Sequence, residues 1–181
     1  MRIISGRAKG TRLKTGDSDK VRPTKDVVKE AVFNMIFDFP EESKCLDLYA
    51  GFGNLGLEAA SRGADSVTFV EIDHTNCDII KENIELTHCQ DVSEVVCNKA
   101  RSYLSYTDKK FDLIFIDPPY DSGEYDKVLE DLIAKDCLIN PAILVVEYYV
   151  REKPEIDLDD YLVLREKEYG TTGILLLEYQ G

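Results

Sequence analysis

Five short apolar runs alternate with segments of helical spacing along the middle of the chain, and this alternation limits the folds that it can adopt. The runs predict strands at residues 45–49, 67–71, 93–97, 112–116 and 142–148. Helices are predicted from the glycine-rich segment after the first strand to about residue 62, and at 75–86 and 125–134. Near-continuous apolar strands separated by helices are typical of a parallel sheet that is covered on both faces.

The two ends of the chain differ from this middle part. Residues 2–14 contain two glycines and five basic side chains, and they predict a basic hairpin or loop. A helix is predicted from about Thr24 to a point before Pro40, because apolar residues recur there at helical spacing. Strands at 161–165 and 174–179 leave no room for a crossover helix, so they predict an antiparallel hairpin that turns at 170–173.

The predicted fold class is therefore α/β, Rossmann-like: a doubly wound, mostly parallel sheet of about seven strands with an antiparallel C-terminal hairpin. We expect a basic extension at residues 1–39, followed by one compact domain at 40–181. Hydrophobic residues make up 44% of the chain and charged residues 31%, as in soluble globular proteins. The sequence has no apolar run near the roughly 18 residues of a membrane span and no secretory signal. We expect a cytoplasmic monomer without a membrane partner.

The cysteines argue against a disulfide framework and a metal site. The five residues are odd in number and widely spaced, with no Cys-x-x-Cys pair, and they are Cys45, Cys77, Cys89, Cys97 and Cys137. Only His74 and His88 are available as further soft ligands. We expect reduced, structural thiols and no bound metal.

The net charge of −13 is distributed unevenly. Residues 1–30 carry a net charge of +5, and the remainder carries −18. A basic arm on an acidic body favours contact with phosphate through one face, although a solvated charge run is an equally open interpretation. The candidate contacts in the arm are Arg2, Arg7, Lys9 and Arg12. Arg22 and Thr24 either position a nucleic-acid target or only start the helix.

A glycine motif, Gly51-x-Gly53-x-x-Gly56, follows the first strand and opens a helix. Glu71 ends the next strand, 20 residues after Gly51. This context is that of a nucleotide-binding loop, in which glycines let the backbone approach the ligand and the acid accepts from ribose hydroxyls. An ordinary tight turn is the alternative. The motif alone does not distinguish a dinucleotide from S-adenosylmethionine.

The segment Asp117-Pro118-Pro119-Tyr120 follows the fourth strand and predicts a grip for a planar amine. Two prolines have no N–H to donate, so they end strand pairing and form a rigid turn. If the Asp117 carboxylate and the Pro118 carbonyl accept the two N–H groups of an amine, its lone pair turns towards an electrophilic methyl group. Tyr120 can stack on the base. A strand-ending turn without this chemistry is the alternative.

With these motifs the chain resembles the 16S ribosomal RNA guanine-N2 methyltransferase family over nearly its whole length. The matching segments are Arg2-Ile3-Ile4, Lys9-Gly10, Arg22-Pro23-Thr24, Phe33-Asn34, Asp47 to Gly56, Glu71, Asn83, Asp117 to Tyr120 and Tyr169-Gly170. The resemblance implies a Rossmann-like enzyme that methylates a guanine of 16S rRNA, as free rRNA or within the small ribosomal subunit. It also implies S-adenosylmethionine as the cofactor, bound by Asp47, Ala50, Gly51, Gly53, Asn54, Gly56, Glu71, Ile72, Asn98 and Ala100.

The chain departs from the family pattern at two places. After the third strand the family usually has an Asp-Ala pair whose acid accepts from the adenine amine of the cofactor, and here the pair is Lys99-Ala100. An ammonium has no acceptor, so Asn98, a backbone carbonyl or water has to take this role. Phe52 and Asn54 stand in the glycine loop where small residues are common.

Three other functions remain open at the level of sequence. A DNA adenine-N6 methyltransferase shares the Asp-Pro-Pro-Tyr motif, but 181 residues leave no separate target-recognition domain. A dinucleotide-dependent oxidoreductase fits the glycine motif and does not explain Asp117 to Tyr120. A non-catalytic RNA-binding assembly factor of the same fold is supported only by Lys99 and Phe52.

Overall fold

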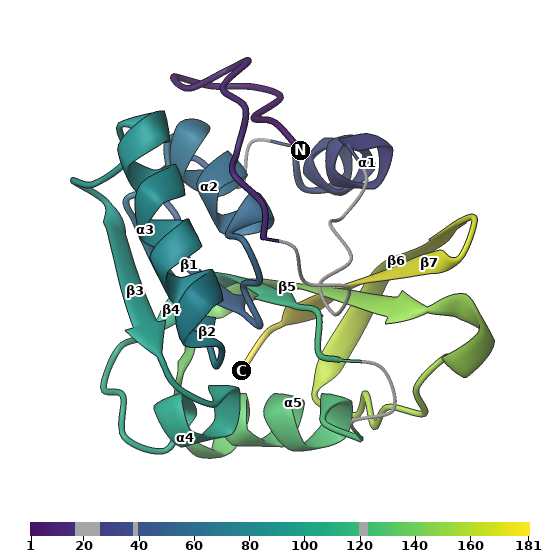
Figure 1. Ribbon diagram of the computed structural model, residues 1–181. Coiled ribbons are helices and arrows are strands. Elements are labelled where there is room, and N and C mark those ends of the chain that lie inside the picture. The colour runs from purple at the N-terminus through teal and green to yellow at the C-terminus, as the bar shows by residue number, and fades with distance from the viewer. Residues whose placement is uncertain (17–25, 38–39, 120–122) are drawn as a thin grey trace.

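The computed structural model describes residues 1–16, 26–37, 40–119 and 123–181, and in it seven strands form one sheet (Figure 1). The strands are β1 Lys44–Leu48, β2 Ser66–Glu71, β3 Ser93–Cys97, β4 Phe111–Ile116, β5 Leu138–Tyr149, β6 Tyr161–Tyr169 and β7 Thr172–Tyr179. The helices are α1 Asp26–Ile36, α2 Asn54–Ser61, α3 His74–Thr87, α4 Ala100–Leu104 and α5 Tyr125–Ala134, with a 3-10 turn at Val150–Glu152. The predicted helix start at Thr24 lies outside the described residues.

The sheet has the order β3-β2-β1-β4-β5-β7-β6. The first five strands in this order are parallel, and β7 runs antiparallel between β5 and β6. The chain moves outwards from β1 to β3 and then returns to the other side of β1 with β4. The strand order therefore reverses between β1 and β4, where open α/β sheets bind ligands at the carboxyl ends of their strands. The predicted fold class is confirmed.

Helices cover both faces of the sheet, as Figure 1 shows: α1, α2 and α3 lie on one side, and α4 and α5 on the other. The apolar core consists of two clusters, one between each group of helices and the sheet, because successive strand residues point to opposite faces. In β4, Phe115 packs under the first group, with its ring 5.8 Å from that of Phe33 in α1. Ile116 packs under the second group. Within the described part of the chain, no helix is long and apolar enough to cross a membrane.

The N-terminal arm, residues 1–16, is a hairpin, as predicted. Arg2 and Arg12 form a bridge, and the Ile3 amide donates to the Thr11 carbonyl at 2.9 Å. The turn of the hairpin lies against the end of α2. Gly6 has a φ of 77°, and a Cβ there would lie 1.8 Å from the Ser61 carbonyl oxygen, so only glycine permits this approach.

Strands β5 and β6 and the loop between β6 and β7 differ in length from the prediction. β6 continues through charged residues to Tyr169, since an edge strand can expose both of its faces and β7 supplies its hydrogen-bond partners. The hairpin loop contracts to Gly170 and Thr171. β5 starts earlier than predicted and contains Pro141, next to a shift in its pairing with β4. Helix α4 was not predicted, because its five residues are too few for a periodic signal.

Candidate active site

Three carboxylates lie in a row at the carboxyl ends of β1, β4 and β5. Asp47 is near the end of β1, Asp117 follows β4 directly, and Glu147 is near the end of β5. Ile116 pairs with Val146, so Asp117 lies beside Glu147. Residues two positions earlier in each strand pack under α1, α2 and α3, so the three carboxylates share that face.

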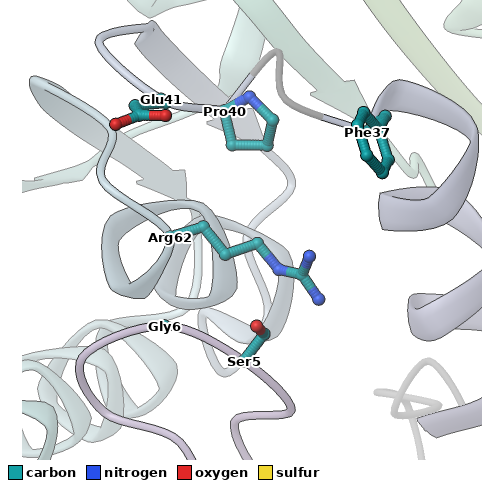
Figure 2. Close-up of a pocket in the computed structure, with 6 residues that line it drawn as sticks. All are labelled: Ser5, Gly6, Phe37, Pro40, Glu41 and Arg62. Atoms are coloured by element: carbon teal, nitrogen blue, oxygen red, sulfur yellow. The ribbon is translucent and has the colours of Figure 1, made fainter.

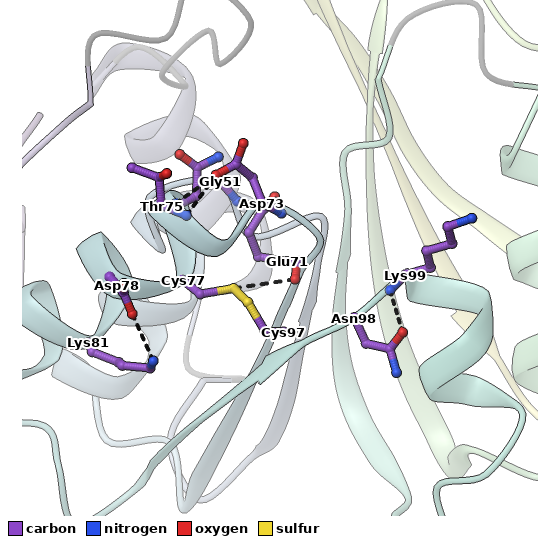
Figure 3. Close-up of a disulfide and its surroundings, with 11 residues drawn as sticks. Gly51, Glu71, Asp73, Thr75, Cys77, Asp78, Lys81, Cys97, Asn98 and Lys99 are labelled. Carbon is purple, nitrogen blue, oxygen red and sulfur yellow. Dashed lines mark hydrogen bonds and ion pairs between the residues drawn. A yellow bond between two sulfur atoms is a disulfide. The ribbon is translucent and has the colours of Figure 1, made fainter.

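The glycine loop between β1 and α2 is held by acids from neighbouring strands. The Glu71 carboxylate accepts from the Gly51 amide at 2.8 Å and from the Asp73 amide at 2.8 Å (Figure 3). The Asp47 carboxylate accepts from the Gly56 amide at 2.8 Å. A Cβ on Gly56 would lie 2.4 Å from the Phe69 ring, so a side chain there would push α2 off the sheet. These hydrogen bonds fix the glycine loop and the start of α2 against strands β1 and β2.

Burial raises the pKa of Asp47 to about 7; the Gly56 hydrogen bond opposes this shift and the nearby Glu71 carboxylate adds to it. The pKa of Asp47 in the folded state lies above its unfolded value of about 3.9. The contribution of Asp47 to stability is therefore complete below about pH 3.9 and is lost as the pH rises to about 7. We predict that Asp47→Asn removes up to about 1.4 kcal/mol per pH unit from this slope. Urea unfolding between pH 4.5 and 7.5 measures it, and parallel curves for the two proteins would contradict the prediction.

The ends of β2 and β3 carry the remaining predicted cofactor residues on that side of the sheet. Ile72 is 59% exposed directly after Glu71. Asn98 is half-buried after β3, and its side-chain oxygen accepts from the Lys99 amide at 2.8 Å (Figure 3). Ala100 is buried as the first residue of α4. The fold therefore brings Glu71, Ile72 and Asn98 to one edge.

The prediction that all the cysteines are reduced is wrong for one pair. Cys77 in α3 and Cys97 at the end of β3 form a disulfide, with Cα atoms 6.1 Å apart (Figure 3). The pairing is tertiary in origin: the first turn of α3 lies at the carboxyl edge, directly after β2, and the parallel strand β3 brings Cys97 back to the same edge. Cys45, Cys89 and Cys137 are free and buried, as expected. No group of three or more potential ligands among the described residues is arranged to hold a metal ion.

Asn54 and Phe52 face the protein interior. The Asn54 side-chain oxygen accepts from Lys29 Nζ at 2.8 Å in the core between α1 and α2. Phe52 is buried, and its carbonyl accepts from the Asn83 side chain at 3.0 Å. The non-glycine residue with positive φ at the start of the loop is Tyr49, at 64°. Phe52 therefore takes an ordinary backbone conformation, and the strained, left-handed backbone conformation is that of Tyr49, three residues earlier.

The Asp-Pro-Pro segment leaves the sheet beside the glycine loop. Asp117 is partly buried, Pro118 is buried and Pro119 is exposed, while Tyr120 lies outside the described residues. Burial raises the pKa of Asp117 well above its usual range, and the carboxylates of Glu147 and Asp47 raise it further. β4 ends at Ile116, as the two prolines predict.

Two groups near Asp117 were not predicted from the sequence. Glu147 is one, although an acid at the end of the apolar run 142–148 was an available signal. Its backbone carbonyl accepts from the Tyr125 hydroxyl at 3.2 Å, which fixes the end of β5 against α5. The other is Tyr49, whose hydroxyl donates to Glu124 at 3.1 Å and thereby joins the glycine loop to the start of α5.

The predicted RNA-binding residues of the arm are exposed but spread along the molecule. Arg7 forms a bidentate pair with Asp91, ahead of β3, at 2.9 and 3.1 Å, so it lies at the amino edge of the sheet. Arg2 is 3.5 Å from Asp26, at the start of α1. Lys9 and Arg12 are exposed, with no carboxylate paired to either among the described residues. Arg22 and Thr24 lie outside the described part.

Lys29 does not contribute to the basic surface, although it was counted in the basic N-terminal segment. Its side chain is fully buried between α1 and α2, where Nζ lies 3.2 Å from Glu58 and donates to the Arg2 carbonyl at 2.6 Å. Burial lowers the pKa of Lys29, and the Glu58 carboxylate opposes this shift. This lysine is therefore a core group that ties the arm to the body, and it does not add to the basic charge on the surface.

A cavity of about 200 Å³ lies at the amino edge, away from the carboxylate row (Figure 2). It is lined by Ser5, Gly6, Phe37, Pro40, Glu41 and Arg62. The Arg62 guanidinium lies 4.6 Å from the centre of the Phe33 ring, and its Nε donates to Glu58 at 2.8 Å. These contacts engage Arg62 in holding α2 to α1 and the arm.

The seven-stranded sheet with its reversed final hairpin, the glycine loop and the Asp-Pro-Pro turn at the strand-order reversal define a Rossmann-like methyltransferase. Residues 1–178 match the family model described as Conserved hypothetical protein 95. The ribosomal RNA small subunit methyltransferase D of Haemophilus influenzae is 34% identical over 97% of this chain and 90% of that protein. That of Escherichia coli K12 is 31% identical over 98% and 89%. The chain belongs to this family of ribosomal RNA methyltransferases, which confirms the resemblance.

Solved structures agree with this assignment. The protein yhhF from Escherichia coli, 30% identical, superposes with a TM-score of 0.89 over 100% of this chain and 98% of that chain. A protein from Haemophilus influenzae, 31% identical, has a TM-score of 0.84 over 99% and 98%. The arm and the C-terminal hairpin are therefore included in the shared fold.

Proposed function

We propose that this protein transfers a methyl group from S-adenosylmethionine to the exocyclic N2 amine of a guanine in 16S rRNA of the small ribosomal subunit. The observation that carries the proposal is the position of Asp117-Pro118-Pro119 beside the glycine loop, where the strand order reverses. The names of the relatives, ribosomal RNA small subunit methyltransferase D, support the ribosomal substrate. Such a substrate places the reaction in the cytoplasm.

The residues at the ends of β1 and β2 fit S-adenosylmethionine, which supplies a methyl group on a positively charged sulfur. Gly51 and Gly53, with φ of 56° and 80°, leave the loop backbone open to close approach. Each Glu71 oxygen accepts one backbone N–H, and a carboxylate has lone pairs for further donors such as ribose hydroxyls. The exposed Ile72 side chain offers an apolar surface for a base.

Two further groups complete the proposed cofactor site. Asp47 and Ala50 hold the glycine loop, since Asp47 accepts from the Gly56 amide and the Ala50 amide donates to the Val70 carbonyl at 3.0 Å. Asn98 and the backbone of Ala100 take the adenine end, because the Lys99 side chain has no acceptor. Asn54 contributes to the site indirectly: its buried side chain accepts a hydrogen bond from Lys29 and so holds the start of α2.

The acceptor side of the site needs alignment more than covalent chemistry. The lone pair of a nucleobase amine is delocalised into the ring, so it has to be turned towards the methyl group. The Asp117 carboxylate and the Pro118 carbonyl accept the two N–H groups, and Tyr120 stacks on the base. The target guanine has to leave its stack to reach them.

A transfer assay tests the proposal. The protein is incubated with methyl-labelled S-adenosylmethionine and with small subunits, naked 16S rRNA or DNA, and the labelled nucleoside is identified. N2-methylguanine in RNA supports the proposal. N6-methyladenine in DNA would favour the adenine methyltransferase, and no transfer to any of these substrates would favour the assembly factor.

The arm gives a second prediction. Lys9 and Arg12 are the arm cations without a paired carboxylate in the described part, so we propose that they contact phosphate. Changing both to glutamate is expected to weaken RNA binding. It should also reduce the slope of log K against log salt by about 1 to 2, because each phosphate contact contributes about 0.7 to 0.9. Filter binding at several salt concentrations measures both effects.

The matched control changes Lys127 and Lys135 to glutamate in and just after α5, on the other side of the sheet. The change in net charge is the same, so a general electrostatic effect would lower binding equally in both double variants. Equal salt slopes in the arm variant and the wild type would show that the arm does not contact phosphate.

A further inference from the structure

Glu147 is a second carboxylate at the proposed acceptor site, and the Asp-Pro-Pro-Tyr motif gives it no role. Resting on the proposed function, we infer that Glu147 accepts a hydrogen bond from N1–H of the target guanine while Asp117 accepts one from the N2 amine. The pair of carboxylates thereby selects guanine over adenine, a choice that the motif itself does not make.

The backbone fixes the two acids side by side. β4 and β5 are parallel neighbours, and their pairing runs in register from Leu113 with Ile143 to Ile116 with Val146. The next residues, Asp117 and Glu147, therefore occupy adjacent positions on one face, about 5 Å apart along the direction of the inter-strand hydrogen bonds. The Tyr125 hydroxyl and the antiparallel partner β7 hold the end of β5 in place.

Two adjacent carboxylates suit a base that presents two adjacent donors. The Watson–Crick edge of guanine offers N1–H next to the N2 amine, whereas the amines of adenine and cytosine each lie next to a ring nitrogen that only accepts. A carboxylate opposite that nitrogen would face a lone pair. Sites built to hydrogen-bond one partner reject the analogue that leaves a buried polar group unpaired.

The same geometry explains how the two acids coexist. Carboxylates that share a site repel each other, which disfavours ionisation of both. Burial is the largest cause of the raised pKa of Asp117, and the Glu147 carboxylate raises this pKa further, which agrees with their proximity. A hydrogen bond to a carboxylate favours its ionised form, so two N–H donors on the guanine edge oppose this shift, whereas the adenine edge offers only one.

The test replaces Glu147 with glutamine and the target guanine with 2-aminopurine. 2-Aminopurine keeps the amine at C2 but has an acceptor at N1, and a glutamine amide can donate to it. After the modified nucleotide has been mapped, 16S rRNA carrying either base at that position is made by splinted ligation and assembled into small subunits. Single-turnover methyl transfer is then measured for the wild type and for Glu147→Gln.

The wild type is expected to prefer guanine by about 10²-fold, and Glu147→Gln to lower this ratio by about 10-fold or more, since one well-placed base contact discriminates by about 1–3 kcal/mol. Equal losses on both bases would indicate a purely structural role and overturn the inference alone. A wild type that leaves guanine N2 unmethylated would overturn the proposed function as well.

Glu147→Asp keeps the test decisive if the glutamine variant does not fold. The shorter side chain retains the charge, so the preference for guanine is expected to persist while the rate on guanine falls by about 10-fold. An unchanged rate on guanine, or loss of the preference, would contradict a hydrogen bond from N1–H to Glu147.

Discussion

Replacing Asp117 with alanine is expected to reduce methyl transfer by about 10³-fold or more, while the dissociation constant of S-adenosylmethionine changes by less than about threefold. Asp117 follows β4 directly, where we propose that the acceptor amine binds, whereas the glycine loop follows β1 and Glu71 ends β2. Under the proposed mechanism, removing the acceptor of an amine N–H leaves the lone pair unaligned and does not disturb the proposed ribose and adenine contacts. Single-turnover transfer and equilibrium cofactor binding, measured on the same preparation, separate these effects.

Asp112 provides the matched control for this experiment. Asp112 lies in β4, the strand that Asp117 follows, but at the amino edge, where its carboxylate accepts from the Lys44 amide at 2.7 Å. Asp112→Ala is expected to leave the transfer rate per folded molecule unchanged. Gly51→Val gives the opposite reference, because a side chain in the loop blocks the cofactor. A loss of cofactor binding in Asp117→Ala as large as in Gly51→Val would contradict the division of roles between β1 and β4.

Replacing Glu58 with glutamine is expected to lower the free energy of unfolding by about 3 to 5 kcal/mol, the usual cost of breaking a buried ion pair on one side. The Glu58 side chain is fully buried and accepts from the amides of Ile4 and Ser5 at 2.8 and 3.0 Å. Arg62 and Lys29 supply its two cations. The NH₂ group of a glutamine cannot accept hydrogen bonds from the groups that donate to Glu58, and the neutral amide leaves the buried ammonium of Lys29 without a counter-charge. Urea unfolding measures the loss.

Two comparisons make this result specific. Adding Lys29→Met to Glu58→Gln should recover part of the stability, since the ammonium that lacks a carboxylate is removed. The exposed pair between Lys81 and Asp78 is the surface reference, and Asp78→Asn is expected to cost less than about 1 kcal/mol. Faster hydrogen exchange at the Ile4 and Ser5 amides is expected in Glu58→Gln. Unchanged exchange there would show that Glu58 does not hold the arm.

Much of the fold follows from local pattern. The apolar runs place the strands within a few residues, because a strand that is buried on both faces has to be apolar throughout. α5 begins at Tyr125 and ends at Ala134, as the spacing predicts. Pattern fails where contacts are distant: charged residues up to Glu168 belong to β6 because β7 pairs with them. The buried Lys29 looks like a surface lysine because its partners lie in α2 and the arm.

The sequence by itself determined the order of the strands along the chain, the glycine loop at Gly51 to Gly56 and the end of β4 before the two prolines, since each depends on residue chemistry over a few positions. The tertiary structure alone decided which acids meet. Asp117 and Glu147 are 30 residues apart in sequence, and the register of β4 with β5 makes them neighbours. Sheet register and helix packing also bring Cys77 to Cys97 and Lys29 to Glu58. Contacts of this kind depend on the summed burial of the whole core, which no local pattern records.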